Sequence, residues 1–538
     1  MTMPNSQPNS RPESTSPAAQ PSSRFDKPIA APYPGLRPFE PHESAIFFGR
    51  DEHVAEMLTV LEDHRFLAVV GPSGGGKSSL VLAGLLPALR RGELLTARSP
   101  DWRFVTLRPG DDPFGNLARA AQEFLETKTS STDASDGNDT GSFHDGDAEL
   151  TELLLRGSPR GFVQTLKDAA VPPPTNVLLL VDQFEEIFRF RAPEQAGTEA
   201  AAAKRRNDAA AFVQLLLATA KQNERPVHVL LTMRSDFLGD CDIFDGLPQA
   251  INAGQYLTPR LNWRQLEQAI VGPPALPQFG GVVDASVVQR ITNDIGTQRD
   301  ELPVVQHALF RAWLQSGDRS LNDGKRTLTI ADYHDVGGIR EALSREADRA
   351  LEECRVLGLE RIVERVFRAL VQRGANGQRV RRPVTLGQLV DETGGELDEL
   401  RSVVDAFRRP DRSFLVPAIS AVPHLEANTR IDISHESLIR QWDSLSHWLL
   451  NEEESESRFR RLVEAERAHR LGEGDLLAEI ELNRLQGWWD AEQPRQAWMN
   501  RYEAPQVGPG AEASFARVDR YFRASRDALE KERAEERR

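Results

Sequence analysis

The stretch GPSGGGKSS, residues 71 to 79, constrains the fold of this chain more than any other feature of the sequence. Its residues Gly71, Gly76, Lys77 and Ser78 satisfy the pattern G-x-x-x-x-G-K-[ST]. The apolar run FLAVV precedes it, and LVLAGLL follows it as an expected helix. In a glycine-rich loop between a buried strand and a helix, backbone N–H groups and the helix dipole converge on phosphate. The stretch therefore predicts the phosphate-binding loop of a nucleotide-binding core.

Each residue of this loop has an expected role. The side chain of Lys77 should reach the β- and γ-phosphates, and the Ser78 hydroxyl should ligate Mg²⁺. The residues that we expect to contact the nucleotide here are Gly71, Gly74, Gly75, Gly76, Lys77, Ser78 and Ser79. The alternative, a glycine-rich turn that binds no nucleotide, requires the pattern to occur by chance.

Apolar runs that alternate with helical stretches indicate the fold class. These runs are FLAVV at residue 66, WRFVTL at 102, NVLLLV at 176 and VHVLLTM at 227. Strands that are apolar on both faces are typical of a parallel sheet covered by helices on both sides. We therefore expect an α/β core of the P-loop NTPase kind, with a parallel sheet similar to AAA+ and STAND proteins.

The pattern changes after residue 256, where helical spacing predicts a helical lid. From Leu359, three helical stretches precede two β-like runs, which is the order of elements in a winged helix. The chain of 538 residues is too long for one core. We predict a disordered leader (1–32), an NTPase core (33–250, with surface insertions at about 128–150 and 192–208), a lid (251–345), a winged helix (346–450) and a charged helical tail (451–538).

Acidic residues follow the third apolar run, in LLLVDQFEEIF. Asp182, at the end of a strand expected to neighbour the loop's strand, should complete the Mg²⁺ site. Either Glu185 or Glu186 is placed to orient and deprotonate the attacking water. The alternative for this pair is the solvated start of a helix, where acidic residues are favoured in any case.

Arg234 follows the fourth apolar run, in HVLLTMRSDF. Ligands of open α/β sheets lie at the carboxyl ends of the strands. The guanidinium of Arg234 is therefore expected to contact the γ-phosphate, the alternative being an ordinary surface arginine.

Composition excludes several classes of protein. The net charge of −15 opposes non-specific binding to nucleic acid. No apolar run approaches the roughly 20 residues of a membrane span, and the N-terminus has no apolar core of a signal peptide. Two distant cysteines, Cys241 and Cys354, suit a reducing compartment. We expect a cytoplasmic protein without a membrane or nucleic-acid partner.

The sequence also resembles a known family, the bacterial STAND-type NTPases, and among them the novel STAND branch often joined to WD-repeat proteins. The motifs that carry the resemblance are YPGLRPFEPHESAIFFGRDE, GPSGGGKSSL, LLLVDQFEEIF, LTMRSDF, ELPVVQHAL, AFRRPDRSFLVP and ISHESLIRQW, in this order. They cover about residues 33 to 530.

The resemblance implies further site residues. Phe48, Gly49 and Arg50 match the family's segment beside the adenine, and Pro303 matches its lid proline near the base and ribose. His435 matches the winged-helix histidine that touches the β-phosphate of ADP and locks the resting state; without the resemblance it would more often be a structural histidine.

The resemblance also assigns roles to residues already singled out. Asp182 corresponds to the Mg²⁺ carboxylate, Glu186 to the catalytic base with Glu185 before it, and Arg234 to the arginine that senses the γ-phosphate.

The winged helix has a second interpretation. Its arginines, which are Arg379, Arg381, Arg382, Arg408, Arg409 and Arg412, could form a basic face for DNA. Because acidic residues are interleaved with them, we favour an intramolecular docking surface.

Taken with the family, these residues predict an ATP-binding and slowly ATP-hydrolysing switch, closed with ADP and open with ATP, which self-associates when active and serves signalling or defence. The alternatives are a nucleotide-locked scaffold without turnover and a DNA-binding regulator. The last helix has an apolar stripe, formed by Phe515, Val518, Phe522, Ser525 and Leu529, that could dock a separate effector or sensor. Its alternative is packing on the winged helix.

Overall fold

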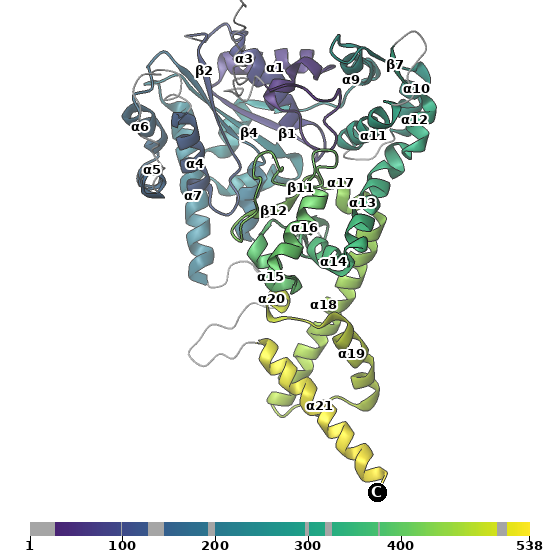
Figure 1. Cartoon of the computed structure of the whole chain (residues 1–538). Helices are drawn as coiled ribbons and strands as arrows, with labels where there is room; N and C mark the ends of the chain where they lie inside the picture. Colours follow the sequence, from purple (N-terminus) through teal and green to yellow (C-terminus); the bar gives the residue numbers. More distant parts are fainter. Residues whose placement is uncertain are drawn as a thin grey trace, which may run out of the picture.

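The computed structural model describes residues 27–97, 99–126, 145–191, 199–295, 301–317, 325–374, 377–502 and 514–538. An α/β core and a helical region lie side by side, a mixed unit lies below them, and helices lead from it to the C-terminus (Figure 1). Most of the predicted leader, residues 1–26, lies outside the described residues.

The core contains a five-stranded parallel sheet in the order β2-β3-β4-β1-β5. Its strands are β1 (Phe66–Gly71), β2 (Trp102–Leu107), β3 (Asn176–Val181), β4 (Val227–Arg234) and β5 (Gln255–Leu257). The four apolar runs are its first four strands, which confirms the parallel α/β core. The short strand β5 was not predicted, and the sheet thus extends past the predicted boundary at residue 250. The expectation that the strand before Asp182 neighbours β1 is wrong, because β4 lies between β3 and β1.

Helices cover both faces of this sheet because residues along β1 alternate between two apolar clusters. Leu67 and Val69 belong to the cluster that also contains Met57, whereas Ala68 and Val70 pack with the cluster that contains Phe212. The first face carries α1 (Asp51–Asp63) and a continuous helical segment formed by α2 (Lys77–Ser79), the π-helical η2 (Leu80–Leu85) and α3 (Leu86–Arg90). The other elements of the core are η1 (Pro41–Ile46), α4 (Pro113–Glu126), α5 (Asp145–Gly157), α6 (Gly161–Asp168), η4 (Phe184–Arg191), α7 (Glu199–Lys221), η6 (Ser235–Phe237), η7 (Gly239–Ile243) and α8 (Leu247–Ala253).

Parts of the two predicted surface insertions are helical. Residues 127–144 and 192–198 lie outside the described residues. Residues 145–150 form the first turns of α5, and residues 199–208 those of α7, so the prediction of loops is wrong there. Alanine, glutamate, lysine and arginine dominate the start of α7, and these are strong helix formers.

The region predicted as a helical lid consists mainly of helices, and its assignment as a lid stays a prediction. Its elements are α9 (Trp263–Ala275), β6 (Gly281–Val283), α10 (Ala285–Asp294), α11 (Glu301–Ser316), β7 (Arg326–Leu328) and α12 (Ile330–Asp335). Tyr33, fully buried near the start of the described chain, donates a hydrogen bond of 2.6 Å to the carbonyl of Ile270 in α9. This contact attaches the N-terminal segment to the lid.

The third unit contains the three helices and the two later strands predicted for a winged helix, together with strands after the first helix that were not predicted, and its assignment as a winged helix stays a prediction. Helix α13 (Gly338–Val356) leads from the lid into it and crosses the predicted boundary at residue 345. Its elements are α14 (Glu360–Ala369), β8 (Val371–Arg373), β9 (Arg379–Arg381), β10 (Val384–Thr385), α15 (Leu386–Thr393), α16 (Leu397–Phe407), β11 (Leu415–Val416), β12 (Arg430–Ile433) and α17 (Ser437–Gln441). Strands β10, β12 and β11 form one sheet.

One part of this unit differs from the prediction. The first of the three predicted helices, α14, ends at Ala369, and the chain continues into β8, which pairs with β9 in an antiparallel hairpin. Thr385 caps α15, since its side chain accepts a hydrogen bond of 3.2 Å from the N–H of Gln388.

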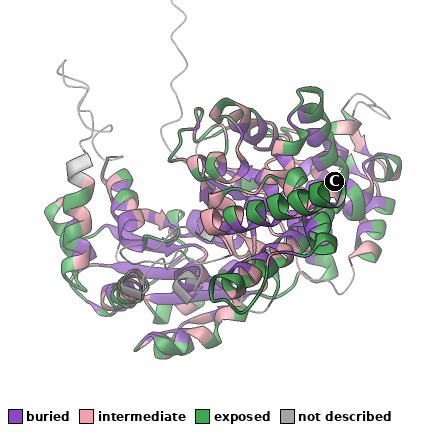
Figure 2. Ribbon diagram, turned by 90° about the horizontal axis from the view of Figure 1, so that it is seen from below, coloured by how far each residue is buried: buried purple, intermediate pink, exposed green. Residues whose placement is uncertain are grey.

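The tail begins within a long helix, α18 (Asp443–Arg470), which continues from the third unit past residue 450. It is followed by α19 (Glu479–Glu492), α20 (Gln496–Met499) and α21 (Ser514–Glu536). The apolar stripe of α21 is buried at Val518, Phe522 and Ser525, where it packs on α18 and α19. The stripe therefore packs within the tail itself, which corrects both interpretations, the docking of a separate protein on this stripe and packing on the winged helix. Figure 2 shows buried residues concentrated in the sheet and exposed residues along the outer faces of the helices.

No helix among the described residues is long and apolar enough to cross a membrane.

Candidate functional site

A cavity of about 740 Å³ lies where the core, the lid and the third unit meet. Twelve predicted site residues line it: Phe48, Arg50, Gly74, Gly76, Lys77, Ser78, Ser79, Glu185, Glu186, Arg234, Pro303 and His435. The other four predicted site residues do not line the cavity themselves. Gly49 and Gly75 are each adjacent in sequence to lining residues, Gly71 accepts a hydrogen bond from Lys77, and Asp182 accepts one from Ser78. The fold thus brings together residues that are up to 387 positions apart, from Phe48 to His435.

The phosphate-binding loop has the backbone that its glycines permit. Gly74 and Gly76 have φ values of 69° and 84°, in the left-handed region that favours glycine. The ammonium group of Lys77 donates to the carbonyls of Gly71 and Pro72, at 3.0 and 2.7 Å. Burial lowers the pKa of Lys77. The lysine is thus held over the loop by backbone carbonyls.

Ser78 and Asp182 form the candidate metal site. The Ser78 hydroxyl donates to Oδ1 of Asp182 at 2.7 Å, and the hydroxyl of Thr232 on β4 donates to the same oxygen at 2.6 Å. Nε of Arg108 lies 3.4 Å from Oδ2. One hydroxyl and one carboxylate beside a phosphate loop fit Mg²⁺, which takes few protein oxygens and completes its shell with phosphates and water. Thr232, on the intervening strand β4, thus holds the Asp182 carboxylate beside Ser78.

A left-handed residue aims the two glutamates at the cavity. Gln183 has a φ of 55°, and its N–H donates to the Thr232 hydroxyl at 2.9 Å. After this turn, Oε2 of Glu185 accepts the backbone N–H of Arg234 at 3.3 Å. Oε2 of Glu186 accepts the N–H of Gly110 at 3.2 Å. Burial raises the pKa of Glu185, which moves this carboxylate toward the range of a proton acceptor near neutral pH.

Arg50 connects the loop to the start of the lid. Its guanidinium donates to the carbonyls of Gly75 and Pro259, at 3.1 and 2.8 Å, and burial lowers its pKa to about 10. Gly49, with a φ of 80°, lies so close to α9 that a Cβ there would be 2.2 Å from the carbonyl oxygen of Gln265. Only glycine fits this contact between core and lid.

The opposite end of the cavity is apolar. The ring of Phe48 packs against Gly272, where a Cβ would come within 2.7 Å of the ring. The apolar lining of this end includes Ile46, Phe47, Leu266, Ile270, Leu302 and Pro303. A polar end with an amide-rich loop and an apolar end with an aromatic ring suit a nucleotide whose base lies between core and lid.

His435 is neutral and has a defined tautomer. Its Nδ1 accepts the backbone N–H of Ser437 at 3.1 Å, so the ring proton resides on Nε2. Burial lowers the pKa of His435 to about 3, with Arg381, Lys77 and Arg234 adding to the effect. The ring therefore supplies one uncharged N–H donor at the wall of the cavity.

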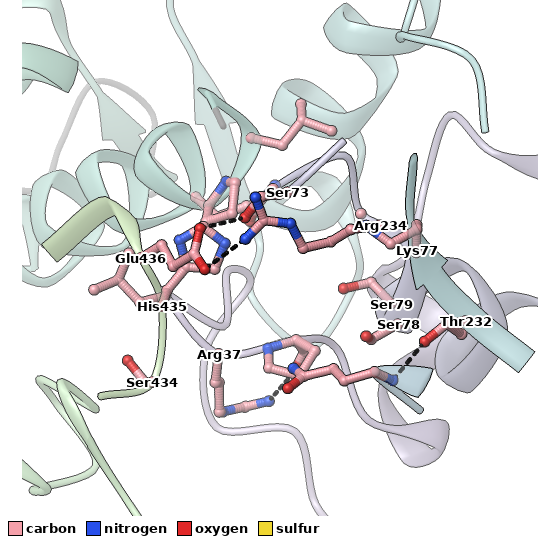
Figure 3. A pocket seen from close by; sticks show the side chains of 18 of the residues that line it. Arg37, Ser73, Lys77, Ser78, Ser79, Thr232, Arg234, Ser434, His435 and Glu436 are labelled. Atoms are coloured by element: carbon pink, nitrogen blue, oxygen red, sulfur yellow. Dashed lines mark hydrogen bonds and ion pairs between the residues drawn. The ribbon is translucent and has the colours of Figure 1, made fainter. Parts of the chain in front are cut away.

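The structure adds residues that the sequence did not single out as site residues. Oε1 of Glu436 lies 2.7 Å from Nη1 of Arg234, and its Oε2 accepts from the Ser73 hydroxyl at 3.3 Å (Figure 3). Arg381 of β9 donates to Asp432 at 2.9 Å and to the side chain of Gln183 at 3.1 Å. The sequence signal for Glu436 was its place in ISHESL beside His435.

The other arginines proposed for a DNA face are engaged within the chain. Arg408 is 1% exposed and pairs with Asp405 at 2.6 Å. The remaining pairs are Arg379 with Glu453, Arg382 with Glu392, Arg409 with Asp411 and Arg412 with Glu346. These side chains do not form an open basic face, and Arg408→Ala would test folding rather than DNA binding.

Solved structures similar to this chain are remote. The Aeropyrum pernix ORC1 protein, in a complex with DNA, has 13% identity and a TM-score of 0.36, over 77% of this chain and 93% of that chain. Cdc6p from Pyrobaculum aerophilum has 13% identity and a TM-score of 0.31, over 75% and 94%. Drosophila ORC bound to DNA has 14% identity and a TM-score of 0.32, over 81% and 96%. Scores this low carry no inference about activity or partners.

No curated protein sequence matches the chain. A family model does: the one described as novel STAND NTPase 1 matches residues 32–474, from the segment before the phosphate loop into the tail. The match covers most of the chain and includes every residue that lines the cavity. The chain therefore belongs to the novel STAND NTPase 1 family.

Proposed function

We propose that this chain binds ADP and ATP in the cavity and acts as a regulatory switch. The observation that carries the proposal is the origin of the cavity walls: Lys77 comes from the core, Pro303 from the lid and His435 from the third unit. A nucleotide there contacts three parts of the chain at once. Exchange of ADP for ATP can therefore shift the equilibrium between their arrangements.

In the closed arrangement, different residues bind the phosphates, the base and Mg²⁺. The loop amides and Lys77 bind the phosphates, and the Nε2–H of His435 donates to the terminal phosphate of ADP. Phe48 and Pro303 hold the base between core and lid. Ser78 and Asp182 would hold Mg²⁺, which would neutralise phosphate charge.

Slow hydrolysis would reset the switch. Glu185 and Glu186 reach the cavity from one turn, and one of them orients and deprotonates water, while Arg234 contacts the γ-phosphate. The rival function is a scaffold that binds nucleotide without turnover. Loss of a measurable ATPase rate in Glu185→Gln or Glu186→Gln would argue against that rival.

We further propose a cytoplasmic protein that self-associates when opened by ATP and meets an effector or sensor in signalling or defence. The two cysteines, Cys241 and Cys354, are free thiols, which suits a reducing compartment. The effector would contact a surface other than the buried stripe of α21. The rival that binds DNA loses support, since its arginines are paired within the chain.

The test of nucleotide binding is a pair of lysine variants. Lys77→Ala removes the buried ammonium group of the loop, and we expect ADP affinity to fall by about a hundredfold or more, because hydrogen bonds to charged phosphates are lost. Lys204→Ala, on an exposed part of α7, serves as the matched control and should bind like the wild type. Titration calorimetry with ADP measures both. A Lys77→Ala variant that binds ADP as tightly as the wild type would contradict the proposal.

A further inference from the structure

Glu436 joins three parts of the site through one carboxylate. One oxygen binds Arg234 of β4 at 2.7 Å, and the other accepts from Ser73 of the phosphate loop at 3.3 Å. Arg440 of α17 lies 3.8 Å away, on the same side. The Glu436 side chain is 11% exposed. The third unit thus places a negative charge directly on the phosphate loop.

The Glu436 carboxylate binds the side chain that we expect to bind a γ-phosphate. Arg234 is expected to contact the γ-phosphate, yet its Nη1 is held by Glu436 and its Nη2 by Asp236 at 2.8 Å. Lys77 and Arg381, which also face this end of the cavity, feel the charge of Glu436 as well. In the closed chain, Glu436 therefore neutralises the cations that a third phosphate would neutralise.

ADP and ATP differ at this position. A diphosphate lacks the phosphate that Arg234 is expected to contact, so it is compatible with the Glu436 contacts. A triphosphate would bring two negative charges against the carboxylate, and like charges within a partly buried site oppose each other strongly. ATP can engage Arg234 only when Glu436 withdraws, and Glu436 is fixed to the segment that carries His435.

We propose that Glu436 makes the closed chain select a nucleoside diphosphate over a triphosphate, by holding Arg234 and Ser73 in place of a γ-phosphate. The inference rests on the proposed nucleotide switch and adds the residue that reads the number of phosphates. It also gives a physical route by which ATP separates the third unit from the core: the γ-phosphate displaces the Glu436 carboxylate.

The experiment compares nucleotide preference in the full-length chain freed of nucleotide. Titration calorimetry with Mg²⁺ measures the dissociation constants of ADP and of a non-hydrolysable ATP analogue. The ratio of the two constants is the readout. Glu436→Gln removes one charge and no heavy atom, and Arg234 keeps Asp236 in that variant. Glu426→Gln, exposed in the loop before β12, is the matched control for loss of a carboxylate from the same unit.

The wild type is expected to bind ADP more tightly than the analogue. Glu436→Gln should reduce this preference by about tenfold or more, mainly by tightening the analogue, because a repulsion between like charges is removed. Glu426→Gln should keep the wild-type ratio.

Three results would overturn the inference. The first is an unchanged ratio in Glu436→Gln, and the second is an equal weakening of both nucleotides, which would indicate a purely structural residue. The third is a wild type that binds the analogue as tightly as ADP, whatever the variants do. A wild type that binds neither nucleotide would overturn the proposed function, and this inference with it.

Discussion

At the scale of single residues, burial at the contact between the lid and the third unit changes the pKa of a histidine, His307. His307 of α11 is fully buried, with its ring centre 5.7 Å from that of Phe414 in the third unit. Burial lowers the pKa of His307 to about 3, and nearby Arg311 adds to the effect. The folded chain therefore keeps this ring neutral at every pH near neutrality.

A pH dependence of stability follows from this group. The unfolded chain protonates His307 below about pH 6.5, whereas the folded chain does not until about pH 3. The folded state therefore has its full stability with respect to His307 above pH 6.5, and the free energy of unfolding decreases as the pH falls from 6.5 toward 3. At pH 5 the loss from one such histidine is about 2 kcal/mol.

We expect His307→Phe to flatten this dependence. Urea unfolding at pH 7, 6 and 5 would show a smaller drop in stability for the variant than for the wild type. His447→Phe, at an exposed position of α18, should keep the wild-type slope. Equal slopes for wild type and His307→Phe would contradict the assignment.

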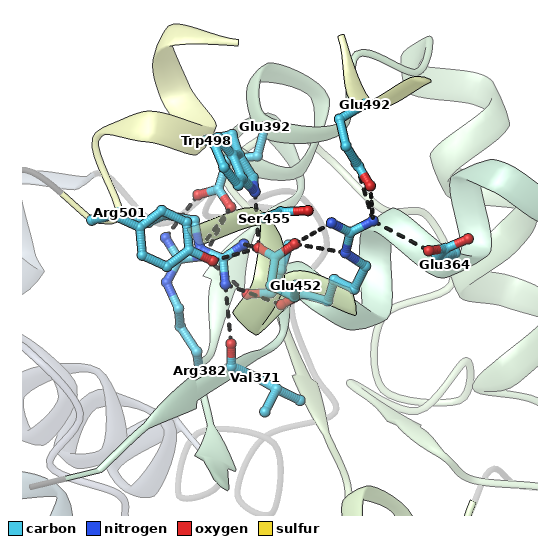
Figure 4. Close-up of polar contacts among 12 residues, drawn as sticks. Glu364, Val371, Arg382, Glu392, Glu452, Ser455, Glu492, Trp498 and Arg501 are labelled. Atoms are coloured by element: carbon cyan, nitrogen blue, oxygen red, sulfur yellow. Dashed lines mark hydrogen bonds and ion pairs between the residues drawn. The ribbon is translucent and has the colours of Figure 1, made fainter. Parts of the chain in front are cut away.

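At the scale of elements, a buried network attaches the tail to the third unit. Glu452 of α18 is 6% exposed and accepts from Arg368 of α14 at 2.6 Å, from Trp498 of α20 at 2.8 Å and from Arg501 at 3.0 Å (Figure 4). Burial alone would raise the pKa of Glu452, but Arg501 and Arg368 hold it below its usual value. The carboxylate is thus ionised and fixes three helical segments.

We predict that Glu452→Gln destabilises the chain by about 3 to 5 kcal/mol, because it removes the carboxylate charge that Arg368 and Arg501 share in a buried network. Glu454→Gln on the same helix is the control. Its side chain is 69% exposed and pairs with Arg458 one turn away, so the loss of this carboxylate should change stability by about 0.5 kcal/mol or less. Urea unfolding measures both variants. A Glu452→Gln variant as stable as the control would show that the network does not attach the tail.

The sequence predicted long elements better than short ones. The first four strands are apolar on both faces, and this local pattern is enough to place them. Strands β5, β8 and β9 have three residues each, too few for an alternating pattern to stand out, and β5 pairs with the distant strand β1. The hairpin also contains arginines, and from the sequence alone these are typical of the charged end of a helix. In the structure, one of them, Arg381, lines the cavity.

The sequence also did not predict which element packs against an apolar helix face. The stripe on α21 was visible in the sequence, but a stripe does not specify its partner. In the fold, Trp489 stacks on Phe522 with ring centres 4.7 Å apart, and Ser525 accepts from the N–H of Leu477 at 3.2 Å. The partner is thus the tail itself.

At the scale of the whole molecule, the candidate site exists only because separate units meet. The loop motif predicted Lys77 and Ser78 from local spacing, whereas the positions of Pro303 and His435 came from the family resemblance. Nothing local indicated that Glu436 would reach Arg234 across 202 residues. The contacts that close the cavity are long-range, and these are the contacts that a switch must break.

The most direct test of the proposed switch is the identity of the nucleotide that purifies with the full-length chain. The wild type is expected to retain ADP, with little turnover of added ATP. His435→Ala removes the N–H donor, so it should lose the bound ADP and self-associate, whereas the exposed-site control His447→Ala should behave like the wild type. A wild type that purifies empty and hydrolyses ATP rapidly, at a rate that His435→Ala leaves unchanged, would contradict the account.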